Sequence, residues 1–437
     1  MSVFETIKTM AEGMEQQLVD TRRDFHQYAE LGWLEMRTTS RIARRLKELG
    51  YELVLGADLY DGDARLGVPA QDVLDAAYEK AAAQGADPEF LPYTKGGMTG
   101  VMGILRCGEG PTVALRFDID ALPVKETNDP GHFPYEEGFH SVNEGVMHAC
   151  GHDGHAAIGL GVAEILAAVK ASLHGTVKLI FQPAEEGVKG AKPIVQKGHL
   201  DDVNFLLGAH IDKRKPEDAG KALIPGSYGS LATRKYDVRY HGLAAHAGAL
   251  PHLGKNALLA ACSAVVNLNA IPRHGDGASR INVGKIVAGS GLNVIADEAY
   301  MGLEVRGATT AINQYMIDCA DQILDHCAAM YGCTCEKTII GEAEGMESDL
   351  DFAETIRTVC QEKLGMPVSD TLSVVSFGSE DFSFMMNRVQ NGGGKATFMR
   401  VLSQVQSVAH NDHFDFSEDC LVSGVEAFCA MTAELMQ

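Results

Sequence analysis

Hydrophobic side chains in the first half of the chain recur with two different periods. Apolar positions at helical spacing predict two helices within residues 1–50, the second ending at Gly50. Short apolar runs predict strands at 100–105, 112–117, 176–181 and 204–209. A helical segment at 154–170 separates the second strand from the third, whereas 57–97 keeps a helical pattern only at 71–84 and resembles an insertion. Because short strands alternate with helices, we expect an α/β layer with a mostly parallel sheet.

From about residue 228 the order of elements changes. The pattern predicts a strand, a helix, two strands, a helix and a strand, at 234–240, 256–270, 280–287, 298–306, 313–331 and 334–340. This β-α-β-β-α-β order is the ferredoxin-like arrangement. After residue 342 the chain returns to helix at 351–364. We therefore predict a larger α/β domain made of 1–228 and 343–437, interrupted by a ferredoxin-like domain at 229–342.

Composition and charge narrow the classes of protein. The 437 residues carry 37 Lys and Arg against 59 Asp and Glu, a formal net charge of −22. Because so large an acidic excess repels a phosphate backbone, we do not expect nucleic acid as a partner. The longest apolar stretch, 158–169, contains Glu164 and is far shorter than the ~20 residues of a membrane span. The first residues lack a basic segment followed by an apolar one, so we expect no secretory signal and a cytoplasmic location.

The ten cysteines are irregularly spaced and are expected to be reduced, and Cys150 stands apart from the others. It lies in the segment 148–155, which reads His-Ala-Cys-Gly-His-Asp-Gly-His. Thiolate, imidazole and carboxylate are the ligands that divalent first-row metals accept. Two glycines allow the backbone to bend so that Cys150 and His152 can face one ion. The alternative is a helix start capped by Asp153, with histidines there by chance.

Further candidate ligands follow the predicted strands. Glu185 and Glu186 come directly after the strand at 176–181, and ligand sites of open α/β sheets gather at the carboxyl ends of strands. One of two adjacent carboxylates can bind a metal while the other acts as a general base. A solvated pair at a helix N-terminus is the alternative. Other candidates at strand ends or in loops are Asp118, Asp120, His210, His410 and His413.

Together these motifs resemble those of the M20 metallopeptidase family, in its amidohydrolase branch. The motifs are His148–His155, Gln182–Gly187, Gly208–His210, Ala245–Gly248, Gly378–Phe382 and the His-x-x-x-Phe of His410–Phe414. Their order and spacing match across nearly the whole chain. The resemblance implies a zinc-peptidase type of catalytic domain, interrupted by a ferredoxin-like domain that serves as lid and dimerisation module.

The resemblance also implies a role for each candidate residue. Two divalent ions, Mn²⁺ or Zn²⁺, would be held by Cys150, His152, Glu186, His210 and His410, with Cys150 as a bridging ligand and His413 as the alternative to His410. Glu185 would be the general base, and Asp120 would orient a ligand histidine. In the lid, His246 would stabilise the tetrahedral oxyanion, often across a dimer interface. Asn293 and Arg306 would bind the substrate carboxylate.

The activity that the resemblance implies is metal-dependent hydrolysis of an amide bond in N-aroyl or N-acyl amino acids. Motifs such as Arg22–His26 and Gly275–Gly284 favour an aromatic acyl group joined to glutamate, with p-aminobenzoyl-glutamate, a folate fragment, first among the candidates. Benzoyl, indole-acyl and acetyl conjugates are alternatives. A homodimer formed through the lid is expected, and a homologous second subunit, or a silent role in such a heteromer, is the other arrangement.

Overall fold

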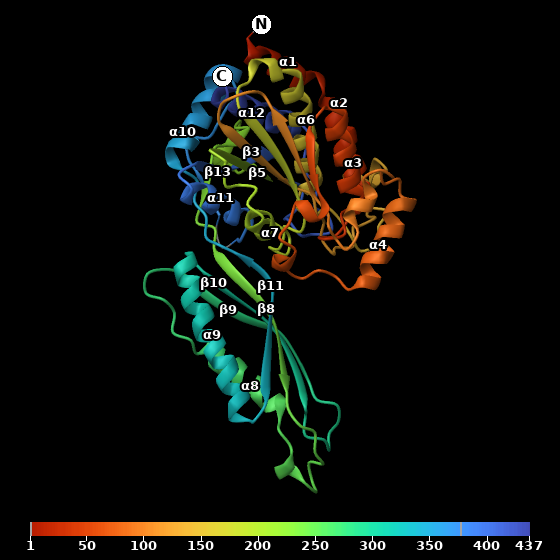
Figure 1. Ribbon diagram of the computed structural model, residues 1–437, viewed down its shortest axis with the longest axis vertical. Helices are drawn as coiled ribbons and strands as arrows, with labels where there is room; N and C mark the ends of the chain where they lie inside the picture. Colours follow the sequence, from red (N-terminus) through yellow and green to blue (C-terminus); the bar gives the residue numbers. More distant parts are fainter. Residues whose placement is uncertain (1, 376–377) are drawn as a thin grey trace. The chain divides into compact units, whose positions relative to one another are not determined.

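The computed structural model describes residues 2–375 and 378–437. They form two compact units (Figure 1). Unit 1 comprises Met1–Tyr228, Glu347–Val375 and Phe384–Gln437, and unit 2 comprises Gly229–Met346 with the described residues of Ser376–Ser383. The chain therefore leaves unit 1 and returns to it, and a short segment before α11 (Phe382–Asn391) belongs with unit 2.

Seven strands form the sheet of unit 1 in the order β1-β2-β4-β3-β5-β13-β6. Their bounds are β1 Glu52–Leu55, β2 Val101–Arg106, β3 Thr112–Asp118, β4 Thr176–Gln182, β5 Phe205–Lys213, β6 Leu223–Ile224 and β13 Lys395–Ser403. The central strands β4, β3, β5 and β13 are parallel neighbours, whereas β1, β2 and β6 pair antiparallel at the two edges. The predicted α/β layer with a mostly parallel sheet is confirmed. Two short strands, β7 (Ser227–Tyr228) and β12 (Ser373–Val374), pair separately.

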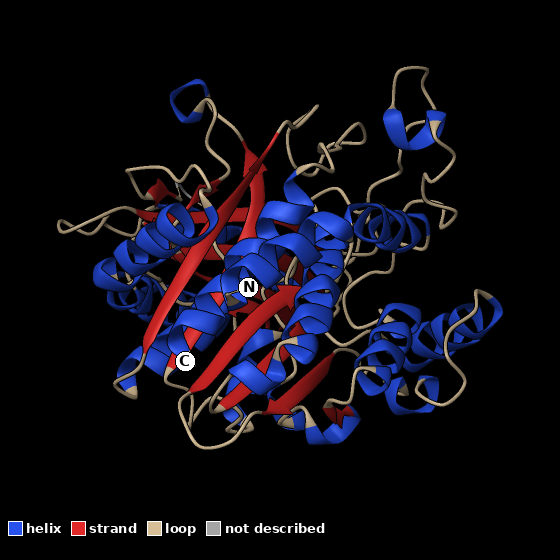
Figure 2. Ribbon diagram, turned by 90° about the horizontal axis from the view of Figure 1, so that it is seen from above, coloured by secondary structure: helices blue, strands red, loops and turns tan. Residues whose placement is uncertain are grey.

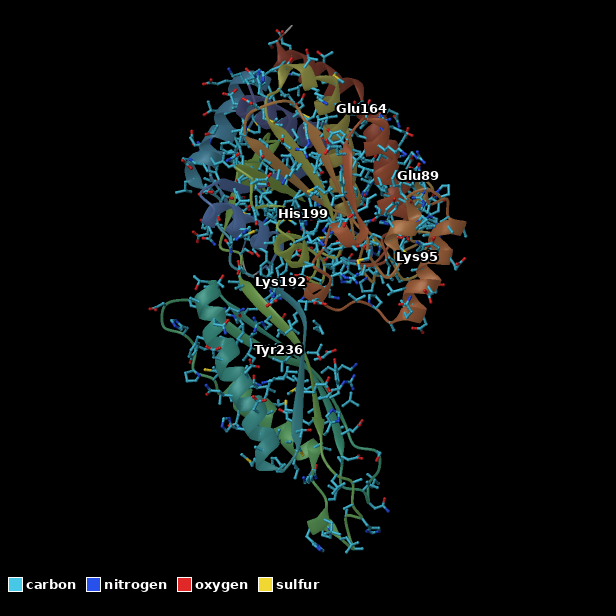
Figure 3. The ribbon with its side chains drawn as sticks, in the orientation of Figure 1. Glu89, Lys95, Glu164, Lys192, His199 and Tyr236 are labelled. Atoms are coloured by element: carbon cyan, nitrogen blue, oxygen red, sulfur yellow. The ribbon has the colours of Figure 1, made fainter. Side chains whose placement is uncertain are left out.

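Two long helices, α6 (His152–Ala168) and α12 (Cys420–Leu435), pack against this sheet and against each other. Helices lie over its strands in Figure 2. A Cβ atom on Gly159 would lie 2.6 Å from the ring of Phe181, so glycine at this position allows α6 to approach the strands. Glu164 of α6, labelled in Figure 3, accepts a hydrogen bond from Arg45 at 2.6 Å. The other helices of unit 1 are α4 Gln71–Ala83, α5 Phe133–Glu136, α7 Ala191–Gln196 and α10 Leu350–Val359.

Three helices, rather than the predicted two, occupy the first fifty residues. They are α1 (Val3–Gly13), α2 (Glu15–Gln27) and α3 (Met36–Glu48). Met14, with φ −104° and ψ 10°, ends the first helix and precedes the second. Its own side chain is buried, so the hydrophobic pattern continues through the break and does not reveal it.

The register of the parallel strands explains how His210 reaches the edge where β3 and β4 end. Arg116 of β3 pairs with Gly208 of β5, and Asp118 pairs with Gln182 of β4. Two residues further along both strands, His210 is therefore level with Asp118. The strand was expected to end before His210, but β5 continues to Lys213 because it pairs there with β13.

Unit 2 is a four-stranded antiparallel sheet with two helices, in the strand order β11-β8-β10-β9. The elements are β8 Ala232–His241, α8 Ala257–Asn269, β9 Ser279–Ala288, β10 Glu298–Gly307, α9 Thr310–Met330 and β11 Thr334–Ala343. Alternate residues of β10, such as Met301 and Val305, are buried in a core shared with the helices. The β-α-β-β-α-β order agrees with the ferredoxin-like prediction.

The remaining predictions from composition concern cysteines and membranes. All ten cysteines are free, and five of the nine other than Cys150 are buried. Among the described residues, no helix combines the length and the apolar character needed to cross a bilayer. In the inserted stretch, Leu74 and Ala81 of α4 pack with Met36 of α3, so this segment covers the N-terminal helices.

One buried carboxyl group makes the stability of unit 1 depend on pH. Burial raises the pKa of Glu426, in α12, to about 7. Because the folded state binds this proton more tightly than the unfolded chain, the stabilisation is complete below about pH 4.5 and is lost as the pH rises towards 7. Glu426→Gln, which stays neutral, should therefore stabilise the protein by about 1–2 kcal/mol at about pH 8, after allowance for solvent screening, and much less at about pH 5.

Thermal unfolding at the two pH values measures this difference. Glu434→Gln is the matched control, since Glu434 lies on the same helix and is exposed. An equal effect of Glu426→Gln at both pH values would contradict the prediction.

Candidate metal centre

The carboxylate of Asp120, just after β3, connects three segments of the candidate site. Its Oδ1 accepts the backbone N–H of Glu185 at 3.0 Å, and its Oδ2 accepts that of Glu186, also at 3.0 Å. Oδ1 also lies 3.3 Å from Nδ1 of His152. Asp120 is 1% exposed. The structure thus places Asp120 where it can orient both glutamates and one imidazole.

The start of α6 brings the predicted Cys/His cluster to this edge of the sheet. Gly151 precedes the helix with φ 91°, a left-handed conformation that glycine adopts without strain. This bend places Cys150 and His152 together: the Sγ of Cys150 and ligand nitrogens of His152 and His210 lie within 4.8 Å of one another. The same distance encloses ligand atoms of Cys150, Glu186 and His410. Cys150 belongs to both groups, which suits a bridging position.

Hydrogen bonds fix the tautomers of two histidines near Cys150. Nδ1 of His210 lies 2.7 Å from the carbonyl oxygen of Ile211, which can only accept, so Nδ1 carries the proton. Nε2 of His210 therefore keeps a lone pair, 3.4 Å from the Sγ of Cys150. His155 differs, because its Nε2 accepts the N–H of Ile211 at 2.8 Å and its Nδ1 contacts Asp118. His155 thus has a structural role in this network.

Of the two C-terminal candidates, His410 joins the cluster and His413 does not. Nε2 of His410 lies 3.4 Å from Oε2 of Glu186. His410 has φ 67°, and its backbone N–H donates to the carbonyl oxygen of Ala149 at 2.7 Å, which ties this loop to the Cys/His segment. His413 instead lies 2.7 Å from Asp412 and 3.3 Å from Asp129.

The donor set fits divalent cations. Both ring nitrogens of His152 and Oε1 of Glu186 are buried without a hydrogen-bond partner among the described residues, a costly arrangement unless a ligand completes it. Burial, reinforced by the charge of Asp120, raises the pKa of Glu186 to about 7. Although burial opposes it, the charge of Asp118 raises the pKa of His152. The surroundings therefore favour positive charge at the place where these side chains meet.

Two supporting contacts escape sequence reasoning. Glu35, fully buried, accepts the N–H of Ala184 at 2.8 Å and the hydroxyl of Thr99 at 2.7 Å, and so fixes the turn that carries Glu185. A single glutamate before a helix offers no signal for this role. Arg22, 0% exposed, donates to Asp153 at 2.7 Å and also contacts Asp415 and Glu418. The motif around Arg22 is visible in the sequence, but its distant acidic partners are not.

The three predicted residues of unit 2 fall into two groups. His246 and Asn293 are exposed neighbours, since the carbonyl oxygen of Asn293 accepts the N–H of Ala247 at 2.9 Å. They lie beyond the end of β10 that begins with Glu298. Arg306 lies near the other end, eight residues or roughly 25 Å along the strand. The structure of one chain therefore does not bring Arg306 together with His246 and Asn293.

Comparisons with known proteins agree with this geometry. A sequence model of peptidase family M20/M25/M40 matches residues 114–434. The chain is 43% identical over 418 residues to indole-3-acetyl-aspartic acid hydrolase of Enterobacter agglomerans, covering 95% of both chains. It is 42% identical over 424 residues to one of the named subunits of p-aminobenzoyl-glutamate hydrolase from Escherichia coli strain K12, covering 97% of both.

Solved structures show the same fold over nearly the whole chain. The crystal structure of aminobenzoyl-glutamate utilization protein from Klebsiella pneumoniae superposes with a TM-score of 0.83 and 37% identity, covering 97% of each chain. A dinuclear metal binding peptidase of the M20 family from Bacillus subtilis shares the fold, with a TM-score of 0.67 and 24% identity over 97% of this chain and 99% of that one. On the family match and the relatives at 42–43% identity, the chain belongs to peptidase family M20/M25/M40.

Proposed function

We propose that the protein is a metal-dependent amidohydrolase that cleaves the amide bond of N-acyl amino acids. The observation that carries this proposal is the buried cluster of Cys150, His152, Glu186, His210 and His410 with Glu185 beside it. The Nε2 of His152 lies 3.8 Å from Oε1 of Glu186 and 3.9 Å from Oε2 of Glu185. A site of this kind needs no Ser or Cys nucleophile, since water can attack the amide carbon.

The five ligand side chains would hold two divalent ions. When bound, these ions would polarise the amide carbonyl and lower the pKa of water towards ~7. One thiolate among imidazoles and carboxylates suits Zn²⁺, and availability can favour Mn²⁺, so both ions are candidates. Asp120 would fix the orientation of His152 and the backbone positions of Glu185 and Glu186.

Glu185 would act as the general base. Its carboxylate would accept a proton from the attacking water and deliver it to the nitrogen of the leaving amine. In unit 2, His246 would stabilise the oxyanion of the tetrahedral intermediate, and Asn293 and Arg306 would bind the carboxylate of the substrate. The separation of Arg306 from His246 in one chain supports a second copy that supplies His246, because one substrate could not contact both within a single unit 2.

For the substrate, we propose an acyl group joined to an acidic amino acid, with p-aminobenzoyl-glutamate first. Two relatives at 42–43% identity are named for p-aminobenzoyl-glutamate and indole-3-acetyl-aspartic acid. Both names describe an aromatic acyl group on an acidic amino acid. The indole-acyl conjugate is therefore the second candidate, and hippurate and acetyl conjugates are weaker ones.

For the assembly, we propose a cytoplasmic homodimer formed through unit 2. Exposed apolar side chains gather on α8 and on the edge strand β9, at Leu259, Val266, Ile286 and Val287. An edge strand with an apolar border is a surface that a second copy can cover. A homologous second subunit is the alternative, because the Escherichia coli relative is named as one subunit of its enzyme.

Replacement of the general base should separate catalysis from metal binding. We expect Glu185→Gln to retain about two ions per chain and to lower kcat on p-aminobenzoyl-glutamate about 10²- to 10⁴-fold, because the amide cannot take up the proton. Metal analysis of the purified variant and steady-state kinetics measure the two quantities. An active variant would rule out the proposed role of Glu185.

The two C-terminal histidines form a matched pair for a test of the ligand set. His410→Ala should weaken metal binding by at least about 100-fold, since it removes a nitrogen close to Glu186 and Cys150. His413→Ala should leave metal content and kcat within about threefold of the wild type, because its ring contacts Asp412 and Asp129. Metal titration with a competing chelator compares the variants, and the reverse ranking would make His413 the ligand.

A charge on the exposed face of α8 should dissociate the dimer. Val266, 70% exposed in unit 2, and Leu350, 72% exposed in unit 1, form a matched pair. We expect Val266→Asp to convert the dimer to a monomer with little activity and Leu350→Asp to leave both properties unchanged, as light scattering and kinetics would show. A wild-type chain that is monomeric and active alone would refute the homodimer, and activity only after addition of a homologous chain would favour the heteromer.

A further inference from the structure

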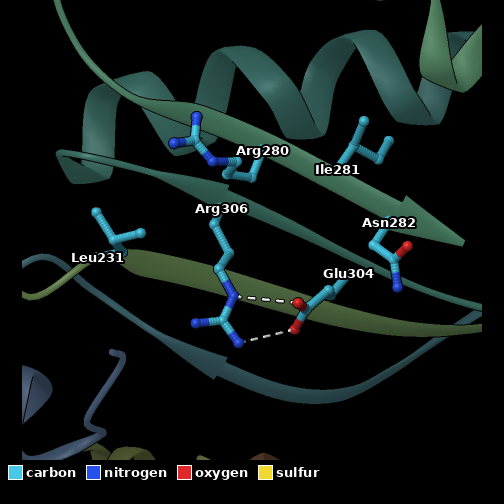
Figure 4. A pocket seen from close by; sticks show the side chains of 6 residues that line it. All are labelled: Leu231, Arg280, Ile281, Asn282, Glu304 and Arg306. Atoms are coloured by element: carbon cyan, nitrogen blue, oxygen red, sulfur yellow. Dashed lines mark hydrogen bonds and ion pairs between the residues drawn. The ribbon is translucent and has the colours of Figure 1, made fainter. Parts of the chain in front are cut away.

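A second arginine accompanies Arg306 on the face of unit 2 that lies opposite the helices. Arg306 of β10 pairs directly with Arg280 of β9, and Glu304 pairs with Asn282. Since Val305 between them is buried in the helix-covered core, these four side chains belong to the other face of the sheet. They line a cavity of about 410 Å³ together with Leu231 and Ile281 (Figure 4). This volume suits a small ligand.

The two arginines are held differently. Nε and Nη2 of Arg306 donate to the two carboxylate oxygens of Glu304 at 3.2 and 3.1 Å, which fixes the plane of this guanidinium. Nη1 of Arg280 donates to the carbonyl oxygen of Ser279 at 3.2 Å, and its side chain is exposed. Figure 4 shows the Arg280 guanidinium extending away from the Arg306–Glu304 pair. The cavity thus presents two guanidinium groups at separate positions on neighbouring strands.

The charge around the cavity is positive although the whole chain is strongly acidic. Lys235 of β8 pairs with Glu304, so the same face carries Arg280, Arg306 and Lys235 against one carboxylate. Like charges directly opposite each other destabilise an antiparallel pair. An anion with two negative groups would remove this repulsion between Arg280 and Arg306, and guanidinium groups bind carboxylates in a bidentate manner.

We infer that Arg280 is a specificity-determining residue that binds the side-chain carboxylate of an acidic amino acid while Arg306 binds its α-carboxylate. This inference rests on the proposed function and narrows it, since the leaving amino acid would be glutamate or aspartate rather than a neutral residue. Asn282 lies beside Arg280 on β9 and can donate to the same side chain. A neutral leaving group would leave the Arg280 guanidinium without this contact and would be hydrolysed more slowly.

Two substrates that differ in one group test the inference. The wild-type enzyme is compared on p-aminobenzoyl-glutamate and on p-aminobenzoyl-glutamine, which replaces the side-chain carboxylate with a neutral amide of the same shape. We expect Arg280→Gln to lower kcat/KM about 10- to 100-fold on the glutamate conjugate and less than about threefold on the glutamine conjugate. Arg280→Lys should keep part of the preference, because it keeps the charge but loses the bidentate contact. Equal losses on both conjugates, or no loss on either, would overturn the inference.

Arg239→Gln is the matched control. Arg239 is exposed on β8 and pairs with Tyr300 of β10, away from the Arg280 cavity. This variant should hydrolyse both conjugates like the wild type. If it lowered the glutamate preference as much as Arg280→Gln does, a general loss of positive charge would explain the result and the assignment to Arg280 would fail.

A binding measurement keeps the inference separate from the proposed function. Calorimetric titration of the metal-loaded full chain with glutarate, a dicarboxylate, and with butyrate, a monocarboxylate, reports the cavity without turnover. We expect Arg280→Gln to weaken glutarate binding about 10-fold or more and to leave butyrate binding unchanged, while the metal centre is the same in both proteins. If the wild type hydrolysed neither conjugate, the proposed amidohydrolase function would fail, and the glutarate comparison alone would still support or overturn the role of Arg280.

Discussion

The contact on which the candidate site depends is the acceptance of two consecutive backbone N–H groups by one buried carboxylate. Asp120 receives the N–H groups of Glu185 and Glu186 on its two oxygens and faces His152 with one of them. Three segments far apart in the sequence are therefore held at one point. Since consecutive residues of the turn after β4 are fixed together, their two side chains are placed relative to each other before any ion or substrate binds. One carboxylate can then bind metal while its neighbour remains available for proton transfer.

Unit 1 contains two kinds of buried charge, and they differ in how they are balanced. Arg22 is surrounded by Asp153, Asp415 and Glu418, so this cluster supplies its own counter-charge and joins α2 to α6 and to the C-terminal loop. Around His152 and Glu186 the balance is incomplete, because buried donor and acceptor atoms lack hydrogen-bond partners among the described residues. Buried polar groups without partners are costly, so the folded chain holds a site that cations would stabilise. The first cluster gives the second the rigidity that a pre-organised site requires.

How much of this could be predicted from the sequence depends on the distance over which each signal acts. The strands, the ferredoxin-like order and the dense group at 148–155 are local patterns, and each was visible without the structure. The break at Met14 was not, because a buried methionine continues the helical pattern through it. The length of β5 depends on pairing with β13, which is almost two hundred residues away in the chain. Roles that depend on tertiary register, such as those of Glu35 and of Arg280 beside Arg306, have no local signature at all.

The geometry of unit 2 links assembly to recognition. A sheet of ten-residue strands separates its two ends by a distance that no small substrate spans, so the ends that carry Arg306 and His246 must serve different purposes within one chain. A second copy allows both ends to act, since the end left unused by one site can serve the other. Specificity and oxyanion stabilisation would then be provided by different subunits on the same rigid scaffold. The antiparallel register makes this arrangement precise, because a slip by one residue would turn Arg280 and Arg306 to the helix-covered face.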